Sequence, residues 1–195
     1  MKTKFLALVF VALAPFAASA DAPSYSYLDV NYQMSGTFDA GFVSFDTDGY
    51  GLRGSFAVGD NWFVEFDYNA LSTDPDVGDV SGYSLYGGWH GDLLFVKLGY
   101  ASADYAGLDD SGYSAAFGLR TLLGENFEIS GYAGMSDYGN VGTTTDYGVG
   151  AVWMFGDNMG VSFNYDLKSL SDYGGIPGFD VDMDTMGVGF RFNFE

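Results

Sequence analysis

One stretch decides the fold: Phe155-Gly-Asp-Asn-Met-Gly-Val-Ser-Phe-Asn-Tyr-Asp-Leu-Lys168. Its Gly156-Asp157-Asn158 segment is typical of a tight hairpin turn. From Val161 to Lys168, apolar and polar residues then alternate, so a strand here has one apolar and one polar face. The stretch therefore predicts an antiparallel hairpin with one apolar and one polar face.

Similar turns recur at nearly even intervals upstream, at Gly59-Asp60-Asn61, Gly91-Asp92 and Gly124-Glu125-Asn126. Four short turns make four hairpins, and one further strand at each end gives ten strands. We predict strands at 24–35, 47–58, 62–71, 81–90, 93–104, 111–122, 127–137, 146–155, 159–168 and 182–194. Longer polar stretches separate the hairpins at 36–46, 72–80, 105–110, 138–145 and 169–181.

Short turns at one end and long loops at the other are typical of outer-membrane barrels, whose turns face the periplasm. The predicted fold is all-β: a transmembrane antiparallel up-and-down β-barrel of ten strands, with eight strands as the alternative. A soluble β-sandwich would also alternate, but with its apolar face inward. The charges favour the barrel, because every basic residue after the leader falls on the polar, inward parity: Arg53, Lys97, Arg120, Lys168 and Arg191. Outward Trp and Tyr residues gather toward the strand ends, as interfacial girdles do.

The first twenty residues predict an export signal. Lys2 and Lys4 precede an apolar stretch at 5–14 that is too short to span a bilayer, and Ala18-Ser19-Ala20 is a small-residue cleavage site. We therefore divide the chain into a signal peptide, 1–20, and a barrel domain, 21–195.

Composition excludes several classes of function. The net charge of −19 opposes binding to nucleic acid. The chain has no cysteine, and His90 is its only histidine, which argues against a zinc cluster or a Cys/His dyad. His90 adjoins the turn at Gly91, at the predicted periplasmic end and far from the loops. We expect neither an enzyme nor a cofactor.

The signal segment, the Gly-Asp-Asn turns and the final Met186-Gly-Val-Gly-Phe-Arg-Phe-Asn-Phe194 resemble small Gram-negative outer-membrane β-barrels of the opacity and OmpA transmembrane-domain type. The resemblance covers the whole chain after the leader. It implies an outer-membrane location and recognition of the terminal aromatic residue by the barrel-assembly machinery. In this chain Phe194 is penultimate and Glu195 follows it.

Turn geometry also predicts ion pairs inside the lumen. Pairing Val58 with Trp62 places Arg53 opposite Asp67. By the same reasoning, pairing Phe155 with Met159 places Lys168 opposite Asp146. Many glycines share this inward parity. They either leave room for a pore or let large neighbours pack closely.

The loops carry most of the excess acid. Asp180, Asp182 and Asp184 alternate, so their carboxylates share a face, and hard oxygen ligands suit calcium or magnesium. These three are the candidate metal ligands, and the alternative is a solvated, self-repelling surface.

The predicted function is a structural or surface-interaction role through acidic extracellular loops. The alternatives are a narrow channel for small solutes and, less favoured, an outer-membrane enzyme. The expected partners are outer-membrane lipid and lipopolysaccharide, the barrel-assembly machinery and an extracellular ligand that the sequence does not identify. We expect a monomer.

Overall fold

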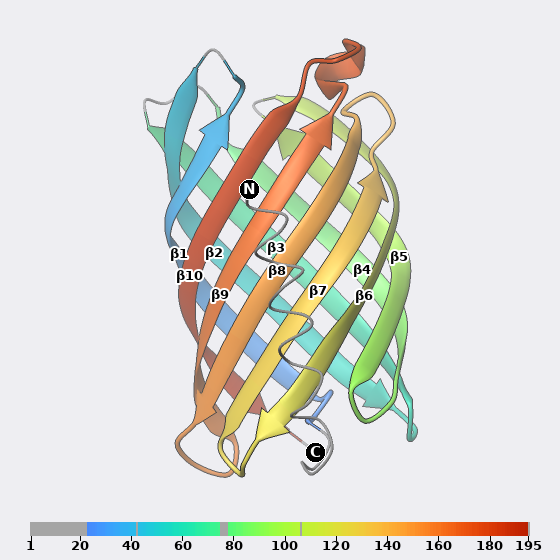
Figure 1. Cartoon of the computed structure of the whole chain (residues 1–195), viewed down its shortest axis with the longest axis vertical. Helices are drawn as coiled ribbons and strands as arrows, with labels where there is room; N and C mark the ends of the chain where they lie inside the picture. The colour runs from blue at the N-terminus through green and yellow to red at the C-terminus, as the bar shows by residue number, and fades with distance from the viewer. Residues whose placement is uncertain (1–22, 42, 75–77, 106, 195) are drawn as a thin grey trace.

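Ten antiparallel strands form one closed barrel, in which β1 closes on β10 (Figure 1). The computed structural model describes residues 23–41, 43–74, 78–105 and 107–194, so the predicted signal peptide lies outside the described residues. The strands are β1 Tyr27–Asp39, β2 Ser44–Val58, β3 Trp62–Asp74, β4 Val80–His90, β5 Leu94–Tyr105, β6 Leu108–Leu123, β7 Phe127–Asp137, β8 Thr143–Met154, β9 Met159–Ser171 and β10 Val181–Asn193. A single 3-10 turn, η2 Tyr173–Gly175, follows β9. The ten-strand prediction is confirmed, and the eight-strand alternative is wrong.

The hairpin register follows the turn chemistry. Val58 lies opposite Trp62, and Ser55 lies opposite Glu65, as predicted. At the hairpin between β8 and β9, the Phe155 amide donates to the Met159 carbonyl at 3.0 Å. Tight turns thus fix which residues of neighbouring strands share a face.

The strands are longer at the loop end than predicted. β1 continues to Asp39, β6 begins at Leu108 and β9 continues to Ser171, so much of the expected loop sequence is strand. Pairing continues because the alternation does, with buried Leu71 and Val181 facing inward and acidic residues facing out. Five aspartates of the predicted loop stretches therefore stand on strands: Asp39, Asp46, Asp74, Asp109 and Asp110.

A β-bulge in β1 was not predicted. Gln33 pairs with Gly187, but Ser35 pairs with the next residue, Met186, so Met34 is the extra residue. The bulge reverses the side-chain parity of the strand above it. As a result Phe38 faces the interior, where it is only 8% exposed.

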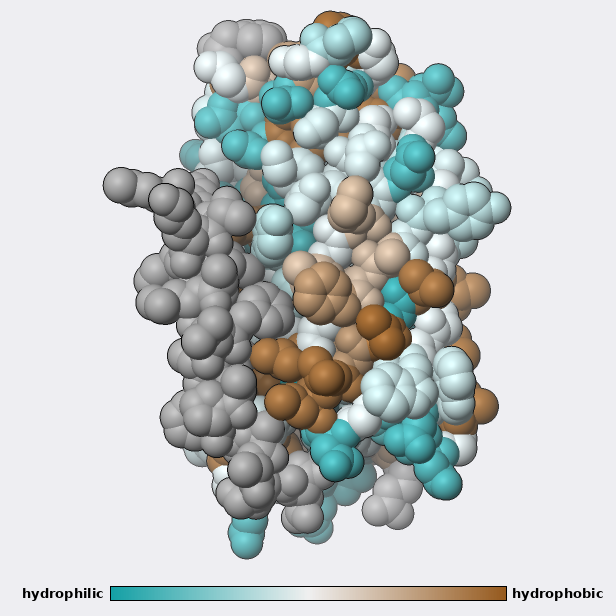
Figure 2. Space-filling model, turned by 45° about the vertical axis from the view of Figure 1, so that its right-hand side comes forward, coloured by the Kyte–Doolittle hydropathy of each residue, from teal (hydrophilic) through white to brown (hydrophobic). Residues whose placement is uncertain are grey.

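The outer wall is apolar around its middle. Figure 2 shows a brown band on the wall between more hydrophilic ends. Tyr113 is 81% exposed and Leu98 is 70% exposed on this surface, which hydrocarbon rather than water can accommodate. Among the described residues, no helix is long and apolar enough to cross a membrane.

Candidate functional site

The structure brings together both predicted luminal pairs. Arg53 Nε donates to Asp67 Oδ1 at 2.9 Å and to Oδ2 at 3.1 Å. Lys168 Nζ lies 3.8 Å from Asp146 Oδ1. The Arg53 and Asp67 side chains keep 34% and 28% of their surface exposed, so this pair is partly hydrated.

A more deeply buried ion network crosses the lumen near the short turns. Glu128 Oε2 accepts a hydrogen bond from Arg120 Nη2, and its Oε1 accepts one from Arg191 Nη1, both at 2.8 Å. Arg191 Nε also donates to Asp29 Oδ2 at 3.1 Å. All four side chains are at most 8% exposed. We define Asp29, Arg120, Glu128 and Arg191 as the inner network, which links β1, β6, β7 and β10.

The sequence indicated only that these charged residues face inward. It did not indicate the contact between Arg191 and Glu128, because their strands are not neighbours in the sheet. Parity alone cannot report which side chains meet across a lumen.

Aromatic rings pack together at the short-turn end of the lumen, next to the inner network. Ser55 Oγ donates to the Tyr25 carbonyl at 2.8 Å and so holds the segment before β1 at this end. The Tyr25 ring stacks on His90, with centroids 3.9 Å apart, and also contacts Phe63. His90 therefore lies at the turn end, packed against rings.

This packing predicts sensitivity to alkali. Burial raises the pKa of the Tyr25 phenol from 10.0 to about 12, an effect that nearby Arg120 partly offsets. The folded state therefore holds its proton more tightly than the unfolded state, and this stabilisation should be complete below about pH 10 and lost as the pH rises through about 12. Urea unfolding across this range should show the loss for the wild type and a smaller one for Tyr25→Phe. Identical pH profiles would contradict the assignment to Tyr25.

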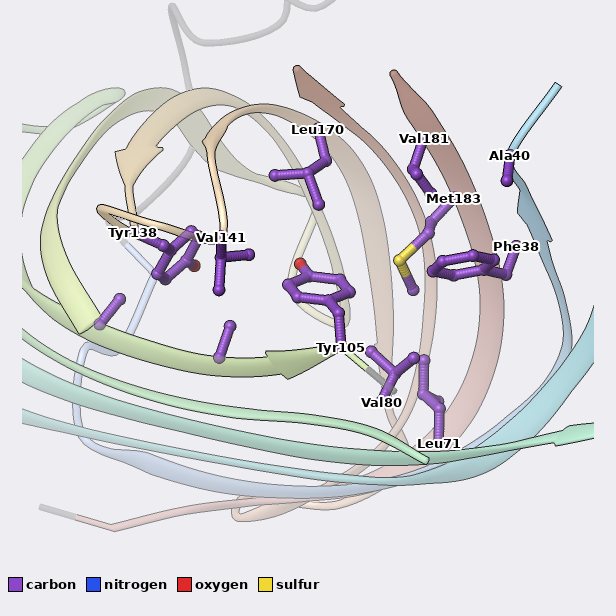
Figure 3. Packing of buried hydrophobic residues seen from close by; sticks show 12 residues of the cluster. Phe38, Ala40, Leu71, Val80, Tyr105, Tyr138, Val141, Leu170, Val181 and Met183 are labelled. Carbon is purple, nitrogen blue, oxygen red and sulfur yellow. The ribbon is translucent and has the colours of Figure 1, made fainter. Parts of the chain in front are cut away.

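An apolar cluster fills the opposite end of the lumen, which we did not predict. We call it the outer plug, and Figure 3 shows its side chains converging from several strands and the segment after β7. Its members are Phe38, Ala40, Leu71, Val80, Ala101, Ala103, Tyr105, Tyr138, Val141, Leu170, Val181 and Met183. At this end the inward side chains are therefore apolar rather than polar as the alternation predicted, and they form a dry core.

A polar cavity of about 210 Å³ lies between the outer plug and the inner network. Seven serines and four side-chain amides are among its lining residues. Its charged lining is balanced, with four cations and four carboxylates: Arg53, Lys97, Lys168, Arg191, Asp29, Asp67, Asp146 and Asp166. Such a cavity suits water or small uncharged polar molecules.

Aromatic rings lie over several of the inward glycines. A Cβ on Gly88 would lie 2.2 Å from Phe63 Cζ, and one on Gly148 would lie 2.1 Å from Tyr132 Cε1. Phe95 similarly covers Gly118. Of the two roles considered for these glycines, close packing against large neighbours matches these contacts.

The candidate metal ligands lie on the outer rim. Asp182 and Asp184 stand on β10, opposite Asp39 and Thr37 of β1, and Tyr165 Oη donates to Asp184 Oδ2 at 3.4 Å. Asp180 is exposed just before the strand. Within the described part of the chain, no three His, Cys, Asp or Glu side chains gather closely enough to hold a metal ion.

The sequence profile of the outer membrane protein beta-barrel domain matches residues 4–194. The chain belongs to this family. Comparison with curated proteins gives no match. Among solved structures, Neisserial surface protein A is 11% identical, with a TM-score of 0.49 over 88% of this chain and 98% of that one. The translocator domain of the autotransporter NalP from Neisseria meningitidis is 14% identical, with a TM-score of 0.48 over 99% and 96% of the two chains.

The KdgM porin is 12% identical, with a TM-score of 0.46 over 87% of this chain and 99% of that one. Surface proteins and porins thus stand at similar distances from this outer-membrane barrel. Similarities this low do not indicate the role of the protein. That role has to be inferred from the residues of the lumen and the rim.

Proposed function

We propose that this barrel is a non-conducting scaffold that presents an acidic outer end to extracellular partners. One observation carries the proposal: apolar side chains pack together across the loop end of the lumen, and a buried ion network with aromatic rings lies across the short-turn end. A dry apolar cluster strongly disfavours the passage of hydrated solutes. The surface left for function is therefore the rim.

Rim carboxylates stand in facing pairs across neighbouring strands. Asp39 lies opposite Asp182, and Asp104 lies opposite Asp109. Like charges directly opposite each other destabilise a sheet. A role in binding therefore explains these carboxylates better than a contribution to the stability of the barrel. We include no enzymatic activity, because His90 is packed at the other end.

A narrow channel is the second candidate, and the balanced polar cavity favours it. If the outer plug moved aside, small uncharged molecules could reach that cavity. The two candidates differ in whether the resting protein conducts.

Planar bilayers test this difference. The mature protein should give no stepwise conductance, whereas a variant that weakens both ends should conduct: Tyr105→Ser/Met183→Ser in the outer plug, combined with Tyr25→Ser/Arg120→Ser at the short-turn end. Heat-dependent gel mobility of the variant would verify that its barrel is folded. Stepwise conductance of the mature wild-type protein would replace the proposal with the channel.

The wall predicts dependence on a membrane. Its exposed apolar side chains have no partner in water, so the mature chain should fold only in detergent or lipid, as a monomer inserted by the barrel-assembly machinery. Boiled and unboiled samples should then migrate differently in gels, and a soluble monomer without detergent would contradict the assignment. Contacts with outer-membrane lipid and lipopolysaccharide belong to the same proposal.

A further inference from the structure

The connection between β9 and β10 leaves one large apolar side chain facing away from the barrel. Tyr173 and Phe179 of this connection pack against the outer plug. Ile176, between them, is 57% exposed, and Pro177 beside it is exposed as well. Figure 1 shows η2 rising above the ends of the strands. We call Ile176-Pro177 the apolar tip.

The connection beneath the apolar tip is held by several hydrogen bonds. The Tyr173 amide donates to the Phe179 carbonyl, and the Gly178 amide donates to Asp172 Oδ1, both at 2.8 Å. Tyr173 Oη also donates to the Tyr105 carbonyl at 2.8 Å, which fastens the connection to the outer plug. Because the tip is already ordered, a partner that buries it loses little conformational entropy.

The backbone of Asp172, at the start of the connection, adopts a left-handed conformation. Its φ of 57° makes it the one non-glycine residue with positive φ in the described ranges. The left-handed conformation costs energy for a residue with a side chain, although aspartate tolerates it better than most. This conformation and the hydrogen bond from the Gly178 amide to Asp172 Oδ1 together fix the start of the connection.

Charge near the apolar tip has a single sign. Asp172 and Asp180 flank the connection, and further carboxylates line the rim of the barrel. The lysines and arginines of the described chain all lie on the lumen side: Arg53, Lys97, Arg120, Lys168 and Arg191. A partner that reaches the tip thus meets a purely anionic surface, which favours a cationic one.

We propose that the apolar tip is the anchor with which the outer end binds a cationic polypeptide that offers apolar side chains between its basic ones. The inference rests on the surface-interaction function proposed above and names the partner class. Ile176 supplies the buried apolar contact, and the rim carboxylates attract the partner and orient it.

Two soluble peptides separate these contributions. One contains only Lys and Gly, and the other is identical except that two central Gly residues are Leu. Binding is measured by titration against the mature protein in lipid nanodiscs, after subtraction of binding to empty nanodiscs. The wild type should bind the Leu-containing peptide at least about tenfold more tightly, the factor that corresponds to about 1.4 kcal/mol.

Ile176→Ser should remove this preference and leave binding of the Lys/Gly peptide unchanged. Val43→Ser is the matched control, because Val43 is an exposed apolar residue in the connection between β1 and β2, and the preference should survive there. A preference that persists in Ile176→Ser, or a wild type that binds neither peptide, overturns the proposal.

A further variant keeps the two proposals distinguishable. If Asp180→Asn/Asp182→Asn weakens binding of both peptides while Ile176→Ser changes nothing, the acidic surface retains its role and the apolar tip does not.

Discussion

Replacing Glu128 by alanine should lower the free energy of unfolding by about 3–5 kcal/mol, which is typical when one partner of a buried ion pair is removed. Glu128 accepts hydrogen bonds from both Arg120 and Arg191. Without it, Arg120 has no ion pair with any carboxylate of the described residues, and among these Arg191 keeps Asp29 alone. A buried guanidinium without a counter-charge is costly because it has lost its water.

Equilibrium unfolding in urea from phospholipid vesicles measures the effect. Arg53→Ala is the comparison, because the partly hydrated Arg53–Asp67 pair should contribute under about 1 kcal/mol. Replacing Arg120 and Glu128 together by methionine should cost less than Glu128→Ala, since the double change removes one cation with the anion. Equal losses for Glu128→Ala and Arg53→Ala would show that the whole lumen is hydrated alike.

Strand number, face and hairpin register could be predicted because each depends on local information. Turn residues such as Gly59-Asp60-Asn61 mark where the chain reverses, and alternation assigns each side chain to a face. The position of Arg53 opposite Asp67 then follows by counting along two neighbouring strands. No knowledge of the rest of the barrel is needed.

The contacts across the lumen could not be predicted in this way. Arg191 meets Glu128 across the lumen, and that contact depends on the tilt and stagger of the closed barrel rather than on sequence spacing. The outer plug depends on Phe38 facing inward, which requires the bulge at Met34. The alternation of residues does not reveal a bulge of one extra residue. The predicted first strand therefore ends at 35, whereas β1 continues past the bulge to Asp39.

Two adjacent glycines of β4 should respond very differently to the same substitution. Gly88 faces the lumen beneath the ring of Phe63, which is 2% exposed and also contacts Tyr25 and His90. Gly87 faces the membrane, and a Cβ there would meet no atom within 4 Å. Both positions are strand, so β propensity affects them alike and only the surroundings differ.

Gly88→Val should therefore destabilise the barrel by about 1–3 kcal/mol, the usual cost of overpacking, because a Cβ would lie 2.2 Å from Phe63 Cζ and the ring is held on other sides. Gly87→Val should be neutral or stabilising, since glycine weakens a strand and valine suits lipid. Adding Phe63→Ala to Gly88→Val should cost less than the sum of the two single changes, because the alanine frees the volume that the valine needs. Urea unfolding of the four variants in vesicles measures these differences. Equal effects at the two glycines would mean that the ring moves freely, and the rings over the inward glycines would then not be what fills this lumen.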